Sequence, residues 1–256
     1  MEISLSRYVI WRLFTRDFTA QFRQKILGYF WAVIAPLFAI ASFVFMNYTG
    51  ILNPGKVPIP YPVFVFFGTS LWGIFIGTLG AVSQGLLVHA DLVIRTDIPK
   101  ISLAVAGLAN MFYSILVNFL VLVLILLFLR VVPSWWALLY PLMIIPLVIL
   151  GVGMGLLLAV IGAVARDVTG AVMTVLGLAM YITPVAYVTD FEKPILRLMV
   201  AWNPLTYLVD VGRNIFFLGK FEGLARYGIA TLFCLAVLVL GIHGFYLIKD
   251  KVAERL

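Results

Sequence analysis

Apolar residues occur along this chain in long, nearly unbroken runs that are separated by short polar stretches. The runs cover residues 27–51, 63–88, 101–129, 137–165, 170–188 and 227–248. A helix needs roughly 20 mostly apolar residues to cross the hydrocarbon core of a bilayer. Each run is apolar on every face and is too long for a membrane strand. The pattern therefore predicts an all-α membrane protein with six transmembrane helices.

The first 26 residues have a different pattern, in which apolar side chains recur at about four-residue steps. Ile10, Phe14, Phe18 and Phe22 share one helical face, and most of the arginine and lysine residues of the segment lie elsewhere on the helix. A helix of this kind lies in the plane of a membrane interface. We expect an amphipathic interfacial helix, which is either a simple anchor or also a docking surface for a cytoplasmic partner.

Residues 189–226 form a third kind of segment. It is too long for a structureless loop and too charged to cross a bilayer twice. Asn203-Pro204 divides it, and Asp210 and Arg213 lie three residues apart on one face of its second half. We predict a short re-entrant helix pair on the outer side, which is either a structural cap or an outer gate. The candidate gate residues are Asp190, Trp202, Asn203, Pro204, Asp210 and Arg213.

The distribution of basic residues predicts the orientation in the membrane. With a cytoplasmic N-terminus, the short outer loops hold only Lys56 and Arg130. The inner side then holds Arg7, Arg12, Arg16, Arg23, Lys25, Arg95, Lys100, Arg166, Lys249, Lys251 and Arg255. This bias favours cytoplasmic termini and an even number of spans.

The expected organisation is a single membrane domain over residues 1–256. Its parts are the interfacial helix (1–26), the first five spans (27–188), the outer segment (189–226), the sixth span (227–248) and a cytoplasmic tail (249–256).

Composition supports a membrane protein and excludes a nucleic-acid binder. The chain is 64% hydrophobic and 11% charged, whereas a soluble domain is roughly 45–50% apolar and about 25% charged. The net charge is +7, but the basic residues lie at the edges of apolar runs. That placement suits anionic lipid headgroups and membrane topology.

The sequence contains no constellation that would carry out catalysis. It has no glycine-rich loop ending in Gly-Lys-Ser/Thr to bind a nucleotide. Its two histidines, His89 and His243, are far apart, and Cys234 is the only cysteine. Ionisable residues lie at the ends of the apolar runs, which argues against proton- or sodium-coupled transport. We expect no catalytic residue, no metal site and no cofactor in this chain, so the energy for transport should come from another subunit.

Aromatic side chains follow one face of the first apolar run. Trp31, Phe38 and Phe45 lie seven residues apart, and Tyr48 adjoins them. This face either contacts lipid or another helix, or it forms a sliding surface on which rings pack against the C–H face of sugars. Methionines of the fifth run would add an adaptable surface. The candidate channel residues are Trp31, Phe38, Phe45, Tyr48, Met173, Met180 and Tyr181.

Five short pieces of the chain, in this order, resemble the permease subunits of ABC exporters for cell-surface polysaccharides, a family that includes O-antigen and teichoic-acid exporters. The pieces are residues 22–31 with Ala35-Pro36-Leu37, residues 92–95 with 98–100, Arg166-Asp167-Val168, Thr183-Pro184-Val185, and Asn203-Pro204-Leu205 with Arg213. The similarity extends over nearly the whole chain and shades into type-2 drug-exporting permeases.

The resemblance implies a homodimer in the cytoplasmic (inner) membrane, bound to two copies of a separate ATPase that holds ATP and Mg. A lipid-linked polysaccharide would pass along a channel at the dimer interface. The chain would be a permease subunit and not an enzyme. ATP-driven motion would be transmitted through Arg23, Arg95, Asp97, Lys100, Arg166 and Asp167. The alternatives are an ABC permease for a small drug or lipid, and an ATP-independent channel or scaffold.

Overall fold

The fold is all-helical over the residues that the structure describes. This computed structural model describes residues 28–88, 107–188 and 194–252, with a few positions before and between them (11, 12, 14–16, 19, 101 and 103). No strand occurs within these ranges. The elements are α2 (Gly28–Tyr48), α3 (Tyr61–Val88), α6 (Leu108–Phe128), the 3-10 helix η1 (Trp135–Leu139), α7 (Tyr140–Val164), α8 (Arg166–Ala179), α9 (Pro194–Trp202), α10 (Pro204–Arg213), the π-helix η2 (Asn214–Leu218) and α11 (Leu224–Val252).

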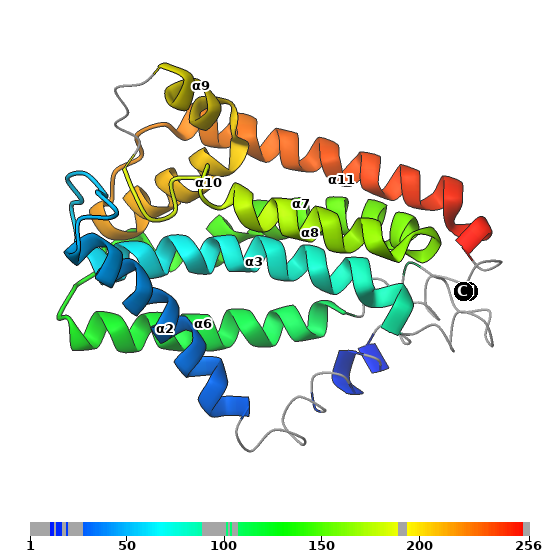
Figure 1. The fold of residues 1–256 in the computed structure, drawn as a ribbon, viewed down its shortest axis with the longest axis horizontal. Coiled ribbons are helices and arrows are strands. Elements are labelled where there is room, and N and C mark those ends of the chain that lie inside the picture. Colours follow the sequence, from blue (N-terminus) through cyan, green and yellow to red (C-terminus); the bar gives the residue numbers. More distant parts are fainter. Residues whose placement is uncertain are drawn as a thin grey trace.

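Helices α3, α6, α7, α8 and α11 run roughly along the long axis of the molecule, and α2 crosses them obliquely (Figure 1). Helix α3 is the most deeply buried of the long helices, and it packs extensively on α7. The bundle has a Tyr61 end, where α3 and α7 begin, and an Arg166 end, where α7 turns into α8.

Glycines allow α7 to approach its neighbours on two sides. A Cβ atom on Gly151 would lie 2.6 Å from Cβ of Thr78 on α3, and one on Gly153 would lie 2.7 Å from Cα of Leu238 on α11. A Cβ atom on Gly241 of α11 would overlap the backbone of Gly153. Small residues at such crossings let helix backbones pack closely in a membrane. The helices α3, α7 and α11 therefore form a tightly packed trio.

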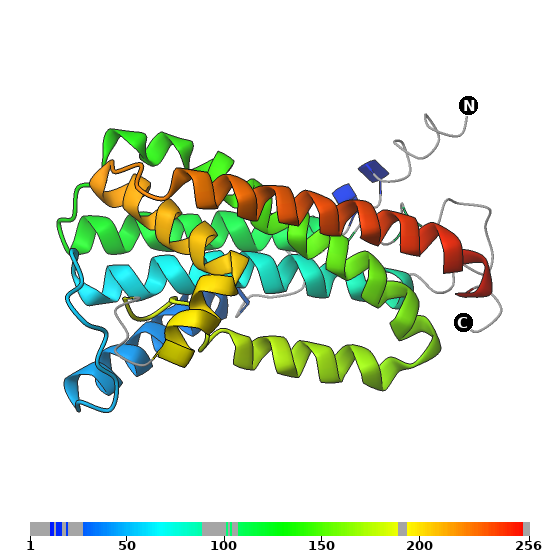
Figure 2. The same cartoon turned by 90° about the horizontal axis from the view of Figure 1, so that it is seen from above.

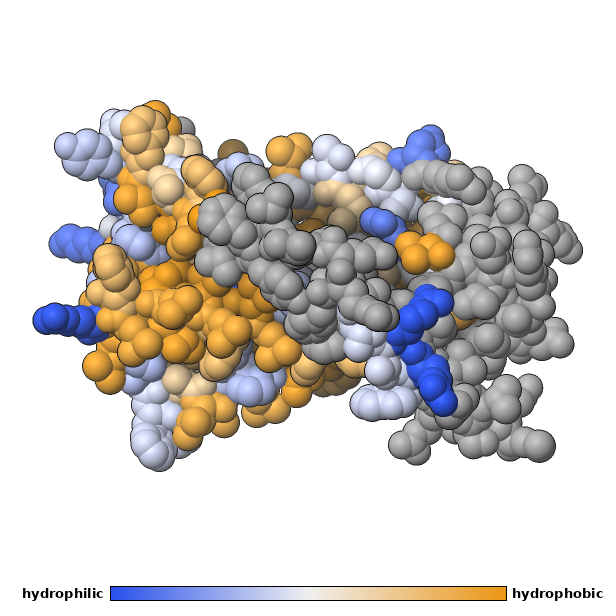
Figure 3. Space-filling view, turned by 90° about the horizontal axis from the view of Figure 1, so that it is seen from below, coloured by the Kyte–Doolittle hydropathy of each residue, from blue (hydrophilic) through white to orange (hydrophobic). Residues whose placement is uncertain are grey.

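The apolar surface is that of a multi-pass membrane protein. Within the described residues, four helical stretches are long and apolar enough to cross a bilayer: Tyr61–Gly85, Met111–Phe128, Trp135–Gly162 and Leu224–Leu247. Two shorter apolar stretches lie in α2 and α8. The face seen in Figure 3 carries a broad apolar area that polar side chains border at the Tyr61 end.

The fifth apolar run differs from its predicted extent. A span over residues 170–188 is expected from hydropathy, but α8 begins at Arg166 and ends at Ala179. The N–H groups of Ile182 and Thr183 both bond to the carbonyl of Ala179. Pro184 has no N–H to continue a helix, and a proline disfavours helical geometry at the residue before it. Residues 180–188 are therefore irregular although their composition is apolar.

The other predicted elements fall close to their observed bounds or outside the described residues. Helices α2 and α7 lie within the first and fourth runs, α3 and α11 extend slightly beyond the second and sixth, and α6 occupies most of the third. The break predicted at Asn203-Pro204 is the observed boundary between α9 and α10. Most of the predicted interfacial helix (1–26) and residues 253–256 lie outside the described residues.

Candidate functional site

The site is centred on α10 and on the irregular segment 180–188, which come together at the Tyr61 end. Asn203 precedes α10 and caps it, because its Oδ1 accepts a hydrogen bond of 3.0 Å from the N–H of Leu205. Pro204 fills the first helical position, where a missing N–H costs nothing. The Nδ2 of Asn203 donates to Oγ1 of Thr183 at 2.8 Å. One residue therefore both starts α10 and ties it to the irregular segment.

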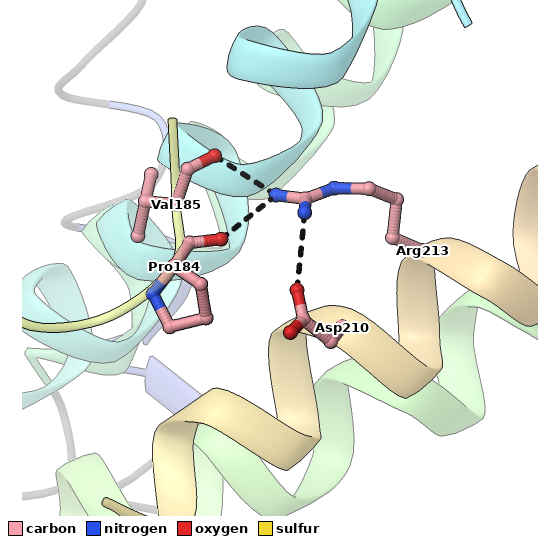
Figure 4. Close-up of polar contacts among 4 residues, drawn as sticks. All are labelled: Pro184, Val185, Asp210 and Arg213. Atoms are coloured by element: carbon pink, nitrogen blue, oxygen red, sulfur yellow. Dashed lines mark hydrogen bonds and ion pairs between the residues drawn. The ribbon is translucent and has the colours of Figure 1, made fainter. Parts of the chain in front are cut away.

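Arg213 makes the second connection, from the last turn of α10 (Figure 4). Its Nη2 donates to the carbonyl oxygens of Val185 at 2.8 Å and Pro184 at 3.3 Å. Its Nη1 pairs with Oδ1 of Asp210 at 3.1 Å. The guanidinium carbon also lies 3.6 Å from the centre of the Phe64 ring on α3. Arg213 is 4% exposed, so each of these contacts is made away from water.

Gly68 on α3 leaves room for this cluster. A Cβ atom at this position would lie 2.6 Å from Nη2 of Arg213 and would overlap the carbonyl oxygen of Val185. A residue with a side chain at position 68 would therefore displace the guanidinium or the backbone that it holds.

Burial sets the electrostatics of the pair. Asp210 and Arg213 carry opposite charges that lie 3.1 Å apart, so each partly offsets the cost of removing the other from water. A buried guanidinium of this kind needs both its ion pair and its hydrogen bonds, because an unpaired buried charge is costly.

Other contacts fix the rest of segment 180–188. The hydroxyl of Tyr61 donates to the carbonyl of Ala186 at 3.1 Å. The N–H of Val188 donates to the carbonyl of Pro54 at 2.9 Å, and the hydroxyl of Tyr187 donates to the carbonyl of Tyr181 at 2.9 Å. Backbone groups that leave a helix at membrane depth need such internal partners.

The predicted gate residues are thus brought together only in part. Asn203, Asp210 and Arg213 all contact the irregular segment or each other, whereas Trp202 at the end of α9 is 80% exposed. Asp190 lies outside the described residues. Sequence reasoning missed Phe64, Gly68 and the carbonyls of residues 184 and 185. A glycine within an apolar run was the only signal for Gly68, and no pattern indicated the carbonyls.

The predicted aromatic face of α2 is open. Phe38, Phe45 and Tyr48 are all exposed, and so is Tyr181 after α8. Helices α2 and α8 lie in the foreground of Figure 1 and along one side of the bundle in Figure 2. The backbone of Trp31 lies in α2, and its side chain is outside the described part of the structure.

The two predicted methionines point inward from that open side. Met173 and Met180 are partly buried against the core. Met173 also lines a cavity of about 390 Å³ between α3, α6 and α8, together with Gly80 and Ser114.

Of the predicted coupling residues, the structure describes only Asp167 and the backbone of Arg166, which lie at the Arg166 end. Ala165 alone separates α7 from α8, and Asp167 is exposed in the first turn of α8. The side chain of Arg166, and the residues Arg23, Arg95, Asp97 and Lys100, lie outside the described part. Within that part, no group of three or more His, Cys, Asp or Glu side chains could hold a metal ion.

Comparisons with a family model and with individual proteins point to the same kind of membrane protein. Residues 8–217 match the model of the family described as ABC-2 type transporter. An "O-antigen export system permease protein RfbA" of Klebsiella pneumoniae is 24% identical over 94% of this chain and 92% of its own length. A protein of the same description from Myxococcus xanthus is 26% identical over 84% of this chain and 83% of its own. A second Klebsiella pneumoniae protein so described is 22% identical over 94% and 92%.

Proposed function

Because this chain belongs to the ABC-2 type transporter family, we propose that it is the membrane subunit of an ATP-driven exporter that moves an O-antigen-like, lipid-linked polysaccharide across the cytoplasmic membrane. The observation that carries this proposal is the similarity to O-antigen export permeases over 94% of the chain. Similarity of that extent includes the spanning helices as well as the α9–α10 segment.

The proposed topology has six crossings, with both termini in the cytoplasm. The 21 residues of α2 correspond to about 30 Å of helix, which matches the hydrocarbon thickness of a bilayer. The 14 residues of α8 correspond to only about 21 Å. The irregular segment 180–188 would complete this crossing, because its backbone groups are bonded within the protein. The Tyr61 end would face outward, and α9 and α10 would form a re-entrant pair there.

The path for the polymer would lie between two copies of the chain. The exposed rings of Phe38 and Phe45 on α2 and of Tyr181 just after α8 support this placement, because α2 and α8 lie at one side of the molecule. Aromatic rings bury the apolar face of a sugar, while tyrosine also offers a hydroxyl. Such contacts tolerate different sugars and are weak enough to let a polymer advance.

Two copies of a separate ATPase would bind at the Arg166 end and hold ATP and Mg. The single-residue link at Ala165 supports a role in coupling, because it leaves little freedom between α7 and the first turn of α8. If Arg166 belongs to the coupling surface, Arg166→Ala should lower polysaccharide-stimulated ATP hydrolysis by the complex without reducing assembly. Lys220→Ala at the opposite end is the matched control. An Arg166→Ala complex with normal stimulation would contradict this role.

The proposed function is tested with the purified complex of permease and ATPase in liposomes. Lipid-linked polysaccharide from the host cells should stimulate ATP hydrolysis, and the same lipid carrier without sugars should not. Equal stimulation by the bare carrier or by small drugs would favour a lipid or drug exporter instead. Nucleotide hydrolysis by the permease alone would overturn the assignment.

A further inference from the structure

Apart from Pro204, the residues of α10 and its two caps that are not buried all have side chains able to form hydrogen bonds. Asn203, Tyr207, Asp210 and Asn214 keep partial exposure, whereas the rest of the helix after Pro204 is buried. Their spacing of four, three and four residues places them within an arc of about 60° on a helix of 3.6 residues per turn. We call these four residues the α10 stripe.

The α10 stripe runs alongside the spanning helices. Arg213 contacts Phe64 and Gly68, and a Cβ atom on Gly212 would lie 3.9 Å from Leu71, ten residues into α3. Seen from above, α10 lies in the foreground and crosses the bundle obliquely (Figure 2). Polar side chains at this depth are not stable against hydrocarbon. The stripe therefore needs a polar counterpart, which is water, a polar ligand or a second subunit.

The polar groups of the α10 stripe are incompletely used within the protein. Asp210 pairs with Arg213 through Oδ1, and its Oδ2 has no hydrogen bond within the described residues, while its side chain is 26% exposed. The hydroxyl of Tyr207 donates to the carbonyl of Ala201 at 2.8 Å, so its lone pairs are available to accept. Asn203 differs, because both ends of its amide are already bonded.

The chemistry of these groups fits sugar hydroxyls. A hydroxyl donates to a carboxylate or phenol oxygen and accepts from an amide N–H. A cation or a lipid phosphate would fit these groups less well. A cation would compete with the guanidinium of Arg213, which already balances the charge of Asp210. A lipid phosphate would be repelled by the second carboxylate oxygen of Asp210. The ring of Tyr207 adds an aromatic surface, over which the guanidinium of Arg226 lies 5.7 Å from the ring centre.

We propose that Tyr207, Asp210 and Asn214 bind hydroxyl groups of the sugar chain in the outer half of the exporter. This inference rests on the proposed function and adds a binding surface to it. Successive turns of α10 are about 5.4 Å apart, comparable with the length of one pyranose unit. A polymer could therefore place one sugar unit against each turn of α10 and shift to the next turn by advancing one unit.

Cysteine labelling of the assembled complex tests the proposal. Cys234 is the only cysteine and is buried, so Cys234→Ala gives a cysteine-free background. Tyr207→Cys and Asn214→Cys report on the stripe, and both leave the Asp210–Arg213 pair intact. Lys220→Cys is the exposed control at the same end, and Leu208→Cys is the buried control on α10. The probe is a charged, membrane-impermeant maleimide that is added from the outer side.

We expect labelling at positions 207, 214 and 220 but not at 208. Delipidated polysaccharide from the host cells, at about ten times its Kd, should slow labelling at 207 and 214 about tenfold and leave 220 unchanged. Absence of labelling at both stripe positions would overturn the proposal, because lipid or protein would then cover the stripe. Labelling that polysaccharide does not slow would also overturn it.

Oxidative cross-linking between copies at position 214, with loss of labelling, would identify a contact between subunits instead and would equally overturn the proposal. ATP hydrolysis stimulated by the lipid-linked polysaccharide is measured on the same variants. Stimulated ATP hydrolysis without protection of the cysteines from labelling would overturn only the sugar-binding role of the stripe. Absence of both stimulation and protection would overturn the proposed function as well.

Discussion

Gly68 and Arg213 meet where the packing leaves no space for another carbon atom. Gly68→Ala should destabilise the protein by about 1–3 kcal/mol, the usual cost of forcing extra volume into a packed site. Thermal unfolding of the purified protein, followed by fluorescence-detected gel filtration, measures the change. Gly73→Ala on the same helix is the control, because its added Cβ would meet nothing within 4 Å. Equal unfolding temperatures for the two variants would contradict the packing argument.

Arg213 combines a charge with a planar set of donors. Arg213→Lys keeps the charge, but a lysine cannot bond Asp210 and two carbonyls in the same geometry or stack on Phe64. We expect a loss of roughly 1.5–3 kcal/mol, the range for a hydrogen bond to a charged group. The melting temperature should fall accordingly. Arg226→Lys, at an exposed position, should leave it nearly unchanged, and a similarly silent Arg213→Lys would disprove the role of the cluster.

Local sequence patterns predicted part of this cluster and could not predict the rest. The proline after Asn203 indicates the start of α10, and the i, i+3 spacing indicates the Asp210–Arg213 pair. The contact between Arg213 and Val185 joins residues 28 positions apart, and Phe64 is far more distant in the chain. Only the packing of α3 against α10 brings these groups together, so no local pattern carries the information.

At the scale of elements, the crossing of α7 and α11 depends on backbone contact. Gly241→Leu should separate the two helices, because even a Cβ atom would overlap the backbone of Gly153. The expected loss is several kcal/mol, well above the roughly 1–3 kcal/mol of ordinary overpacking, and it should appear as aggregation or a large fall in melting temperature. Gly228→Leu, on the same helix but with open space around it, should be tolerated. Tolerance of both substitutions would exclude a close crossing.

Hydropathy predicted the position of most helices and failed at the end of α8. The apolar runs can be recognised in the sequence because a span must carry apolar side chains along its whole length to be stable in lipid. Residues 180–188 have the same composition, yet Pro184 and the donors of Tyr61 and Arg213 impose an irregular backbone. A scale that counts only apolar side chains does not register a missing N–H or a distant donor.

For the whole molecule, the open aromatic face of α2 gives a prediction about transport. Phe38→Ala combined with Phe45→Ala should slow polysaccharide export roughly tenfold, because each aromatic contact contributes about 0.5–1.5 kcal/mol. Export is measured as polymer at the cell surface, with the amount of permease in the membrane as reference. Phe233→Ala on α11 removes an exposed ring from a different helix and should not change export. A normal rate in the double variant would place the path away from α2.

The trio of α3, α7 and α11 also bears on how such a protein can acquire a different cargo. Backbones in direct contact cannot slide without opening voids, so the trio would behave as one frame. In the proposed dimer, the width of the path between two copies would be decided by the surrounding helices α2, α8 and α10. Substitutions in these peripheral helices would widen or narrow the path, while the frame remains unaltered.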